Sequence, residues 1–236
     1  MNLSPNSLAL FPLWFIAFLF SLTCHEAAHA LVAMLGGDPT AFHGGQVTLN
    51  PIPHIRREPF GTVIFPIITY ALSGWMMGWA SAPYDPRWQL SHPRRAAWMA
   101  LAGPAANLAL VLAAGIAIHG GIAAGSFRQP ASANFTHVVT AVSGGMMGGL
   151  AAFLSILFSL NLLLAAFNLL PIPPLDGNTA VGLFLNNESA LSFARLSRNP
   201  GFRMAGLMAA WFLFDWLFGP IFTFGLNLLY PGSAYH

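Results

Sequence analysis

The sequence has very little charge and no lysine at all. Of its 236 residues, nine are basic and seven are acidic, and every basic residue is an arginine. A soluble domain carries about a quarter charged residues, so this chain cannot cover a water-exposed surface. From Gln129 to Leu175 it contains no Asp, Glu, Lys or Arg. These absences exclude an ordinary soluble enzyme and an intrinsically disordered chain.

Two further scarcities narrow the class. A single cysteine, Cys24, excludes a disulfide scaffold. The arginines form no dense basic run, which argues against nucleic acid as a partner despite the sequence pI near 9.1. They lie in short loops between apolar segments, where cations report membrane orientation. The expected environment is therefore a lipid bilayer.

Four apolar stretches are long enough to cross about 30 Å of hydrocarbon at about 1.5 Å per residue. They run approximately over Leu8–Leu35, Ala96–Gly120, Val138–Leu170 and Met204–Tyr230. A fifth stretch, Pro59–Tyr84, is interrupted by glycines and a proline, so it either spans the bilayer or is re-entrant or interfacial. The sequence thus predicts an all-α, multi-pass integral membrane protein of about four transmembrane helices.

The first apolar stretch contains H-E-x-x-H over His25–His29. On a helix, His25 and His29 lie one turn apart on one face, where both imidazoles can bind one zinc ion. Glu26 lies about 100° round the helix and can reach a water on the metal. A glutamate inside a membrane segment is costly, which indicates a function. The alternative is a satisfied polar cluster inside the bundle.

Asp176 is the favoured third ligand, since catalytic zinc usually has three protein ligands and one open position. Three prolines between Pro171 and Pro174 break the preceding helix just before it. Irregular backbone at membrane depth is tolerated only against protein or a wet cavity. Gly177 lets the chain come close at this point. The alternative is an aspartate that caps a helix in a loop.

These motifs resemble the site-2 protease family of intramembrane zinc metalloproteases. The resemblance rests on HEAAH, on AGPAAN at Ala102–Asn107 and on NLLPIPPLDG at Asn168–Gly177. GGQVTLNPIPH at Gly44–His54 resembles the short bacterial branch, which lacks PDZ and CBS domains. We interpret Gly44–Asn50 as a short β-strand or hairpin near the active site, whose edge could hold an extended peptide.

The resemblance implies one zinc ion per chain, held by His25, His29 and Asp176, with Glu26 as general base. Asn168 would help to bind the oxyanion. The implied reaction hydrolyses peptide bonds within or next to the transmembrane segments of membrane-anchored proteins, by zinc-activated water. Residues 1–236 would form a single protease domain, with a catalytic core at about 8–182 and a C-terminal helix at about 204–230. Partners of the chain could further include a second copy of itself or an accessory regulator, and the sequence does not decide between them.

Arginine counts give an independent topology. If Pro59–Tyr84 is re-entrant, eight of the nine arginines share one side and only Arg128 is opposite. If it spans, the split is six against three. The positive-inside rule therefore favours the re-entrant alternative, with the catalytic ends of the helices toward the cytoplasm. The expected location is a bacterial inner membrane.

The main competing function is a metal-ion transporter or channel that uses the same His and Asp ligands. Hydrolysis requires Glu26, and transport does not. Two further residues keep open roles: His54 lines the cavity or is a loop histidine, and Asp215 is a second polar site or a bundle-facing aspartate hydrogen-bonded to another helix.

Overall fold

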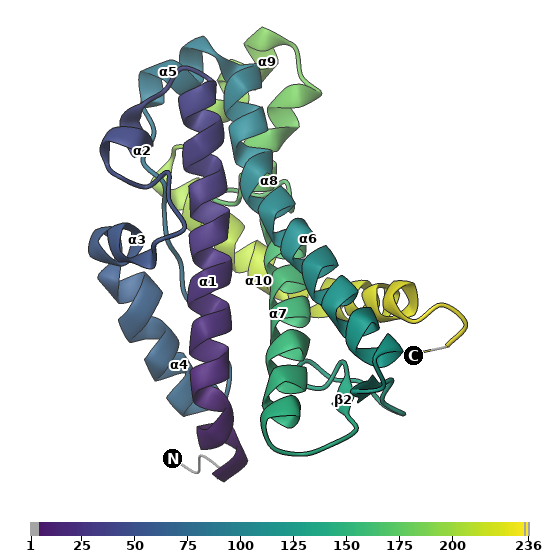
Figure 1. Cartoon of the computed structure of the whole chain (residues 1–236). Helices are drawn as coiled ribbons and strands as arrows, with labels where there is room; N and C mark the ends of the chain where they lie inside the picture. Colours follow the sequence, from purple (N-terminus) through teal and green to yellow (C-terminus); the bar gives the residue numbers. More distant parts are fainter. Residues whose placement is uncertain (1–4, 234, 236) are drawn as a thin grey trace.

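Three long helices form the centre of the molecule in the computed structural model, which describes residues 5–233 and residue 235. They are α1 (Pro5–Leu35), α6 (Pro93–Ala123) and α7 (Met146–Asn168), and each packs against the other two. In Figure 1, α1 and α7 run in the same direction and α6 runs in the opposite direction. The late ends of α1 and α7 therefore lie toward the same end of the bundle.

The length and apolar composition of these helices identify the membrane spans. Within the described residues, Leu8–Leu35, Pro93–Ala123 and Met146–Asn168 are each long and apolar enough to cross a membrane. Helix α10 (Pro200–Leu229) consists of two apolar parts bent by 52°, and it counts as a fourth span if the two parts cross together. The chain is an integral membrane protein, and the predicted helical fold class is confirmed.

The third span begins at Met146 instead of the predicted Val138. Val138 and Val139 are buried, but both of their backbone N–H groups donate to Ser155 Oγ on α7 instead of joining that helix. Hydrophobicity predicted a helix here because burial in a loop against α7 demands the same apolar residues as burial in a helix.

A two-stranded antiparallel sheet connects α6 to α7. Strand β1 (Phe127–Arg128) pairs with β2 (Thr140–Ala141), with Phe127 opposite Ala141. It lies at the far end of α7 from Asp176, about 34 Å away along a helix of this length. A small sheet is therefore present, but away from the predicted catalytic end.

The strand predicted at Gly44–Asn50 is wrong. Helix α2 (Thr40–His43) is followed by turns and bends over these residues. The Asn50 side chain then accepts a hydrogen bond from the Ile52 N–H and caps α3 (Pro51–Arg57). The stretch reads as a strand because of its β-branched residues, but Thr48 and Asn50 form local side chain to backbone bonds that favour turns.

Residues 59–84 do not form a spanning helix. A short π-helix, η1 (Phe60–Ile64), continues into α4 (Phe65–Ser73), and after Gly74 the chain returns without helix to α5 (Pro86–Ser91). The returning chain lies directly on η1, because Trp79 N–H donates to the Gly61 carbonyl at 3.1 Å. A Cβ at Gly61 or Gly78 would collide with the facing backbone, so this approach requires glycine.

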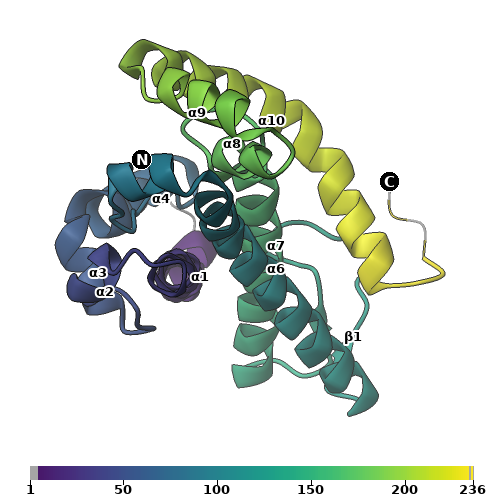
Figure 2. The same cartoon turned by 90° about the horizontal axis from the view of Figure 1, so that it is seen from above.

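Residues 39–84, which include this stretch and are called the re-entrant segment below, begin and end at the end of α1. Asp38, 2% exposed, accepts hydrogen bonds from Thr40 and, at 2.7 Å, from the backbone N–H of Asp85. The chain between them therefore leaves and rejoins the same end of the bundle, as the re-entrant alternative requires. Figure 2, which looks along α1, places α3 and α4 on one side of α1 and α10 on the other side of the core.

The connection from α7 to α10 contains three short elements. They are α8 (Asp176–Ala180), the 3-10 helix η2 (Val181–Leu183) and α9 (Asn187–Leu196). All three contact α6, so the chain that follows α7 is folded back against the bundle.

Candidate metal centre

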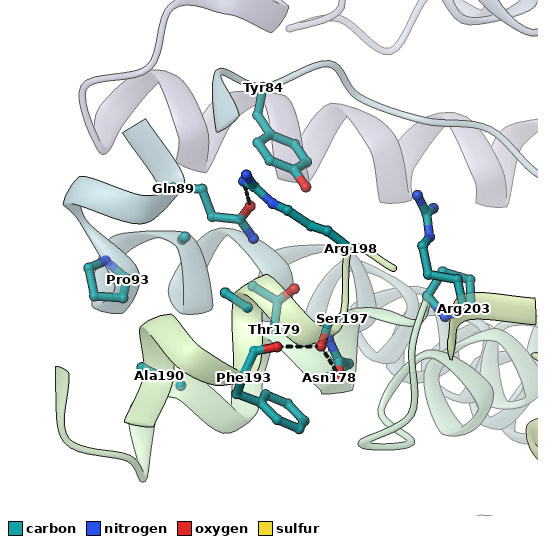
Figure 3. Close-up of a pocket in the computed structure, with 14 residues that line it drawn as sticks. Tyr84, Gln89, Pro93, Asn178, Thr179, Ala190, Phe193, Ser197, Arg198 and Arg203 are labelled. Carbon is teal, nitrogen blue, oxygen red and sulfur yellow. Dashed lines mark hydrogen bonds between the residues drawn. The ribbon is translucent and has the colours of Figure 1, made fainter. Parts of the chain in front are cut away.

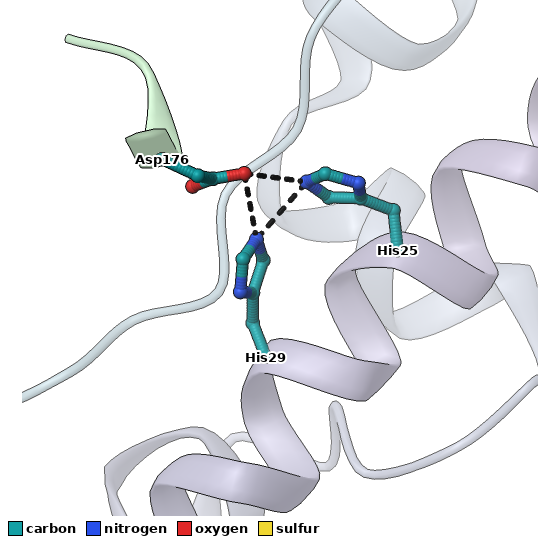
Figure 4. Close-up of side chains that lie close together, drawn as sticks. All are labelled: His25, His29 and Asp176. Carbon is teal, nitrogen blue, oxygen red and sulfur yellow. Dashed lines mark hydrogen bonds and ion pairs between the residues drawn. The ribbon is translucent and has the colours of Figure 1, made fainter. Parts of the chain in front are cut away.

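Three side chains from distant parts of the sequence converge on one point beside α1. His25 and His29 are buried on α1, and their Nε2 atoms lie 3.0 Å apart. Asp176 Oδ2 lies 3.1 Å from His25 Nε2 and 3.2 Å from His29 Nε2. Figure 4 shows the two imidazoles and the carboxylate pointing toward one another. In the described part of the chain, these three residues form a group that could hold a metal ion.

Local sequence explains why Asp176 reaches this point. Pro171, Pro173 and Pro174 lack backbone N–H groups, so α7 cannot continue through them. The chain turns and restarts as α8, with Asp176 at its first residue. Gly177 then packs against the carbonyls of Leu169 and Leu170, where any Cβ would collide. The predicted role of Gly177, a close approach of the chain, is what the structure has.

The far side of each imidazole is held by an acceptor. His25 Nδ1 lies 2.6 Å from Asn107 Oδ1, and His29 Nδ1 lies 2.7 Å from the Met99 carbonyl oxygen. A carbonyl oxygen can only accept, so His29 carries its proton on Nδ1 and donates it to Met99. The same holds for His25 if Asn107 presents its oxygen. Both Nε2 atoms then turn lone pairs toward Asp176.

This convergence of lone pairs fits a metal ion. Two neutral imidazole nitrogens and a carboxylate oxygen at 3.0–3.2 Å repel one another unless a cation lies between them. Tetrahedral zinc at its usual bond lengths separates its ligand atoms by about 3.3 Å. The donor types, the spacing and the outward hydrogen bonds of both imidazoles match such a site.

The carboxyl of Asp176 responds to the same electrostatics. Burial raises the pKa of this carboxyl. When the two Nε2 atoms carry protons in place of a metal ion, the positive charge of His29 and the hydrogen bonds from both rings outweigh burial, and the pKa of Asp176 lies below its ordinary value. The point between the three side chains therefore favours positive charge.

The two predicted catalytic residues have different surroundings. Glu26 is buried, 5% exposed, and follows His25 directly on α1. Asn168 is the last residue of α7, and its amide nitrogen donates to the Leu164 carbonyl of its own helix at 3.0 Å. That bond uses one of the two amide hydrogens. No hydrogen bond among the described residues joins Asn168 to His25, His29 or Asp176.

Sequence reasoning assigned no role to two residues of AGPAAN that the structure places at the group. Asn107 is fully buried and bonds His25. Gly103 brings the α6 backbone against both imidazoles, since a Cβ there would lie 2.5 Å from His25 Nε2 and 2.6 Å from His25 Cε1. In the sequence, the motif contributes only to the family resemblance, and the helical spacing of four residues between Gly103 and Asn107 is the available signal.

A cavity is lined in part by residues close to Asp176 in sequence (Figure 3). Pro174 and Asn178, on either side of Asp176 in sequence, contribute to its wall together with two arginines, Arg198 and Arg203. Arg198 donates to Gln89 Oε1 at 2.8 Å. The residues that line the cavity are both polar and apolar, and none is acidic. They are Tyr84, Gln89, Pro93, Ala96, Pro174, Asn178, Thr179, Gly182, Ala190, Phe193, Ala194, Ser197, Arg198 and Arg203.

The two residues with open roles lie apart from this group. His54 is buried in α3, and its Nε2 donates to the Thr48 carbonyl at 3.1 Å, which makes it a loop-fixing histidine of the re-entrant segment. Asp215 falls at the bend of α10, and its side chain lies outside the described part of the structure.

Fold and site together define an integral membrane protein with a His-His-Asp metal-ligand group built on an H-E-x-x-H helix. The comparisons with known proteins give the family. The model of "Peptidase family M50" matches residues 13–197, most of the chain, and the chain belongs to this family of peptidases.

Curated relatives cover a similar range. "Putative zinc metalloprotease YwhC" of Bacillus subtilis is 36% identical over 171 residues, which are 72% of this chain and 68% of the relative. "Putative zinc metalloprotease Rip2" of Mycolicibacterium smegmatis is 33% identical over 75% of this chain and 58% of the relative. Rip2 of Mycobacterium tuberculosis is 30% identical over 86% of this chain and 69% of its own length. No solved structure matches the chain.

Proposed function

We propose that this chain is an intramembrane zinc metalloprotease that binds one zinc ion through His25, His29 and Asp176. It cleaves peptide bonds within or next to the transmembrane segments of membrane-anchored proteins. The observation that carries the proposal is the convergence of the three ligand atoms within 3.0–3.2 Å inside an apolar helix bundle. Family membership and the relatives named as zinc metalloproteases support it.

A zinc ion bound there supplies Lewis acidity and makes water a usable nucleophile near neutral pH. The other steps belong to side chains of this chain. Glu26 accepts the proton of the attacking water and passes it to the nitrogen of the departing segment. The remaining amide hydrogen of Asn168 is available to the developing oxyanion, provided that substrate binding brings that oxygen within reach.

Water and substrate need a route into the bundle. The cavity between α8, α9 and the start of α6 is lined by Pro174 and Asn178, each two residues from Asp176 in sequence, and carries polar groups such as Asn178 and Thr179 (Figure 3). We assign it as the polar entry to the metal centre. A transmembrane helix hides its carbonyls in internal hydrogen bonds, so the substrate segment must unwind before its carbonyl reaches the site.

Orientation follows from the arginines. Eight of the nine lie either between the end of α1 and the first turn of α6 or between α8 and the first turn of α10, and Arg128 lies in β1 at the other end of the bundle. With the positive-inside rule, this favours the metal centre facing the cytoplasm of a bacterial inner membrane.

Glu26→Gln tests the proposal. It keeps the size of the side chain but removes its basicity, so zinc content should stay at that of the unsubstituted chain while cleavage of a transmembrane reporter falls by about 10²–10⁴-fold. Zinc is measured on the purified protein by atomic emission, and cleavage by the accumulation of reporter fragments.

Glu188→Gln on α9 makes the same chemical change at an exposed position and should cleave normally. A transporter that uses the same ligands does not need Glu26. Unchanged cleavage in Glu26→Gln would therefore contradict the protease mechanism, and zinc uptake into vesicles by this variant would favour transport.

A further inference from the structure

A continuous chain of buried hydrogen bonds leads away from His25 across three helices. Asn107 on α6 donates from Nδ2 to Asn161 Oδ1 on α7 at 2.8 Å. Asn161 Nδ2 in turn bonds Ser21 Oγ on α1 at 2.8 Å and the Leu157 carbonyl at 2.7 Å. Ser21, Asn107 and Asn161 are all 0% exposed. Polar groups buried this completely in an apolar bundle are costly unless every bond is made.

The direction of every bond in this chain is fixed by one backbone oxygen. The Leu157 carbonyl can only accept, so Asn161 must turn its nitrogen toward it and its Oδ1 toward Asn107. Asn107 must then turn its nitrogen toward Asn161, because two facing oxygens would repel. Its Oδ1 is thereby left facing His25, and the ring must donate from Nδ1. A flip of either amide would place like atoms against each other.

The two imidazoles are thus held in different ways. His29 is fixed directly by a backbone carbonyl, that of Met99, which no substitution of a side chain removes. His25 depends on an amide that could flip, and the amide is prevented from flipping by Asn161. If Asn107 flipped, its N–H would face His25 Nδ1 and favour the ring form with its proton on Nε2, the atom that faces Asp176.

We propose that Asn107 and Asn161 are positioning residues for the metal centre: Asn161 locks the amide of Asn107, which holds the Nε2 lone pair of His25 toward the metal. Asn161 has no hydrogen bond to the expected metal ligands and acts on His25 through the amide of Asn107. The inference deepens the proposed function and rests on it for the identity of the metal.

Asn161→Leu is the informative variant because leucine has a similar volume and cannot orient Asn107. Zinc affinity should fall by about 10–100-fold, the usual effect of losing such an outer hydrogen bond. Affinity is measured on the detergent-purified chain by competition with a chromogenic chelator. The ¹⁵N shifts of His25 in the metal-free chain report which ring nitrogen carries the proton, and the variant should gain the Nε2–H form.

Ser21→Ala is the matched control. It also breaks a buried bond to Asn161, but the Leu157 carbonyl still orients that amide. Its unfolding temperature in excess chelator should fall as in Asn161→Leu, while its zinc affinity stays unchanged. Equal losses of affinity in the two variants would mean that the chain merely ties the helices together, and would overturn the proposal.

Two outcomes separate this inference from the proposed function. If the unsubstituted chain binds no zinc, the proposed function fails, yet the ring form of His25 still tests the lock. If Asn161→Leu does not fold, the unsubstituted chain decides alone: the Nδ1–H form of His25 supports the proposal, and the Nε2–H form overturns it.

Discussion

Gly103 is the residue whose smallest change should do most to the metal centre. Its α6 backbone lies against both imidazoles, and a methyl group there would be 2.5 Å from His25 Nε2. Both rings are held from behind, by Asn107 and by Met99, so they cannot retreat without breaking those bonds. We expect Gly103→Ala to weaken zinc binding by about 10–100-fold, from about 1–3 kcal/mol of overpacking. Chelator competition measures the change.

Gly120→Ala on the same helix provides the comparison, because a Cβ at Gly120 meets nothing within 4 Å. It should bind zinc like the unsubstituted chain and gain slightly in helix stability. Normal zinc affinity in Gly103→Ala would contradict the close packing of α6 against the two histidines.

The grouping of His25, His29 and Asp176 was predictable from the sequence because its signals are local. His25, Glu26 and His29 share one helical turn, and Asp176 follows a proline-rich break. The Asn107 bond to His25 joins residues 82 positions apart. Nothing near Asn107 in the sequence states which helix face meets α1, so its contact needed the packed structure. The roles of Glu26 and Asn168 stay predictions.

Asp38 should control the re-entrant segment as a unit. Its carboxylate joins the start and the end of that segment through Thr40 and Asp85. Asp38→Ala leaves two backbone N–H groups without their charged acceptor, and bonds of this kind contribute about 1.5–3 kcal/mol each. We expect faster hydrogen–deuterium exchange throughout residues 39–84, with exchange in α6 and α7 unchanged.

Asp85→Ala is the control for that variant. Its side chain only caps α5, through the Arg87 N–H at 2.7 Å, and its own backbone N–H remains available to Asp38. The loss of a cap costs about 1 kcal/mol, and the faster exchange should be confined to α5. If Asp85→Ala increased exchange throughout residues 39–84 as much as Asp38→Ala, the hydrogen bonds of the Asp38 carboxylate would not be what holds the two ends of the segment together.

Helix spans were predicted well where apolar length alone decides them. The predicted Leu8–Leu35 starts three residues later than α1 and ends at the same residue. The predicted Ala96–Gly120 is three residues shorter than α6 at each end. Two predictions were wrong: the start of the third span at Val138 and the strand at Gly44–Asn50. In both places, buried or β-branched residues belong to loops. There, the choice between helix, strand and turn depends on partners such as Ser155 Oγ, which periodicity does not reveal.

A bound metal ion should stabilise the whole bundle, because it joins α1 to the chain that follows α7. Its removal leaves three mutually repelling ligand atoms at the junction. A ligand at 100 times its dissociation constant stabilises by about 2.7 kcal/mol. The unfolding temperature in detergent should therefore fall when a strong chelator is added, and recover with zinc. In Asp176→Ala the chelator should have no further effect, and an equal fall in that variant would place the stabilising ion elsewhere.

The orientation of the entire molecule can be tested with single cysteines in a Cys24→Ser background. Ser91 in α5 and Ser189 in α9 are exposed at the end where the metal-ligand group lies, and Ser132 is exposed in the connection between the two strands. Cysteines at 91 and 189 should react with an impermeant maleimide only when the cytoplasmic face is open, and a cysteine at 132 only from the opposite side. Because α6 is the helix that crosses between residues 91 and 132, these two positions must be labelled from opposite sides. Labelling of both from one side would refute the crossing pattern.

Labelling of all three cysteines from the sides opposite to those expected would keep the pattern but invert the protein, so that the arginines would no longer face the cytoplasm.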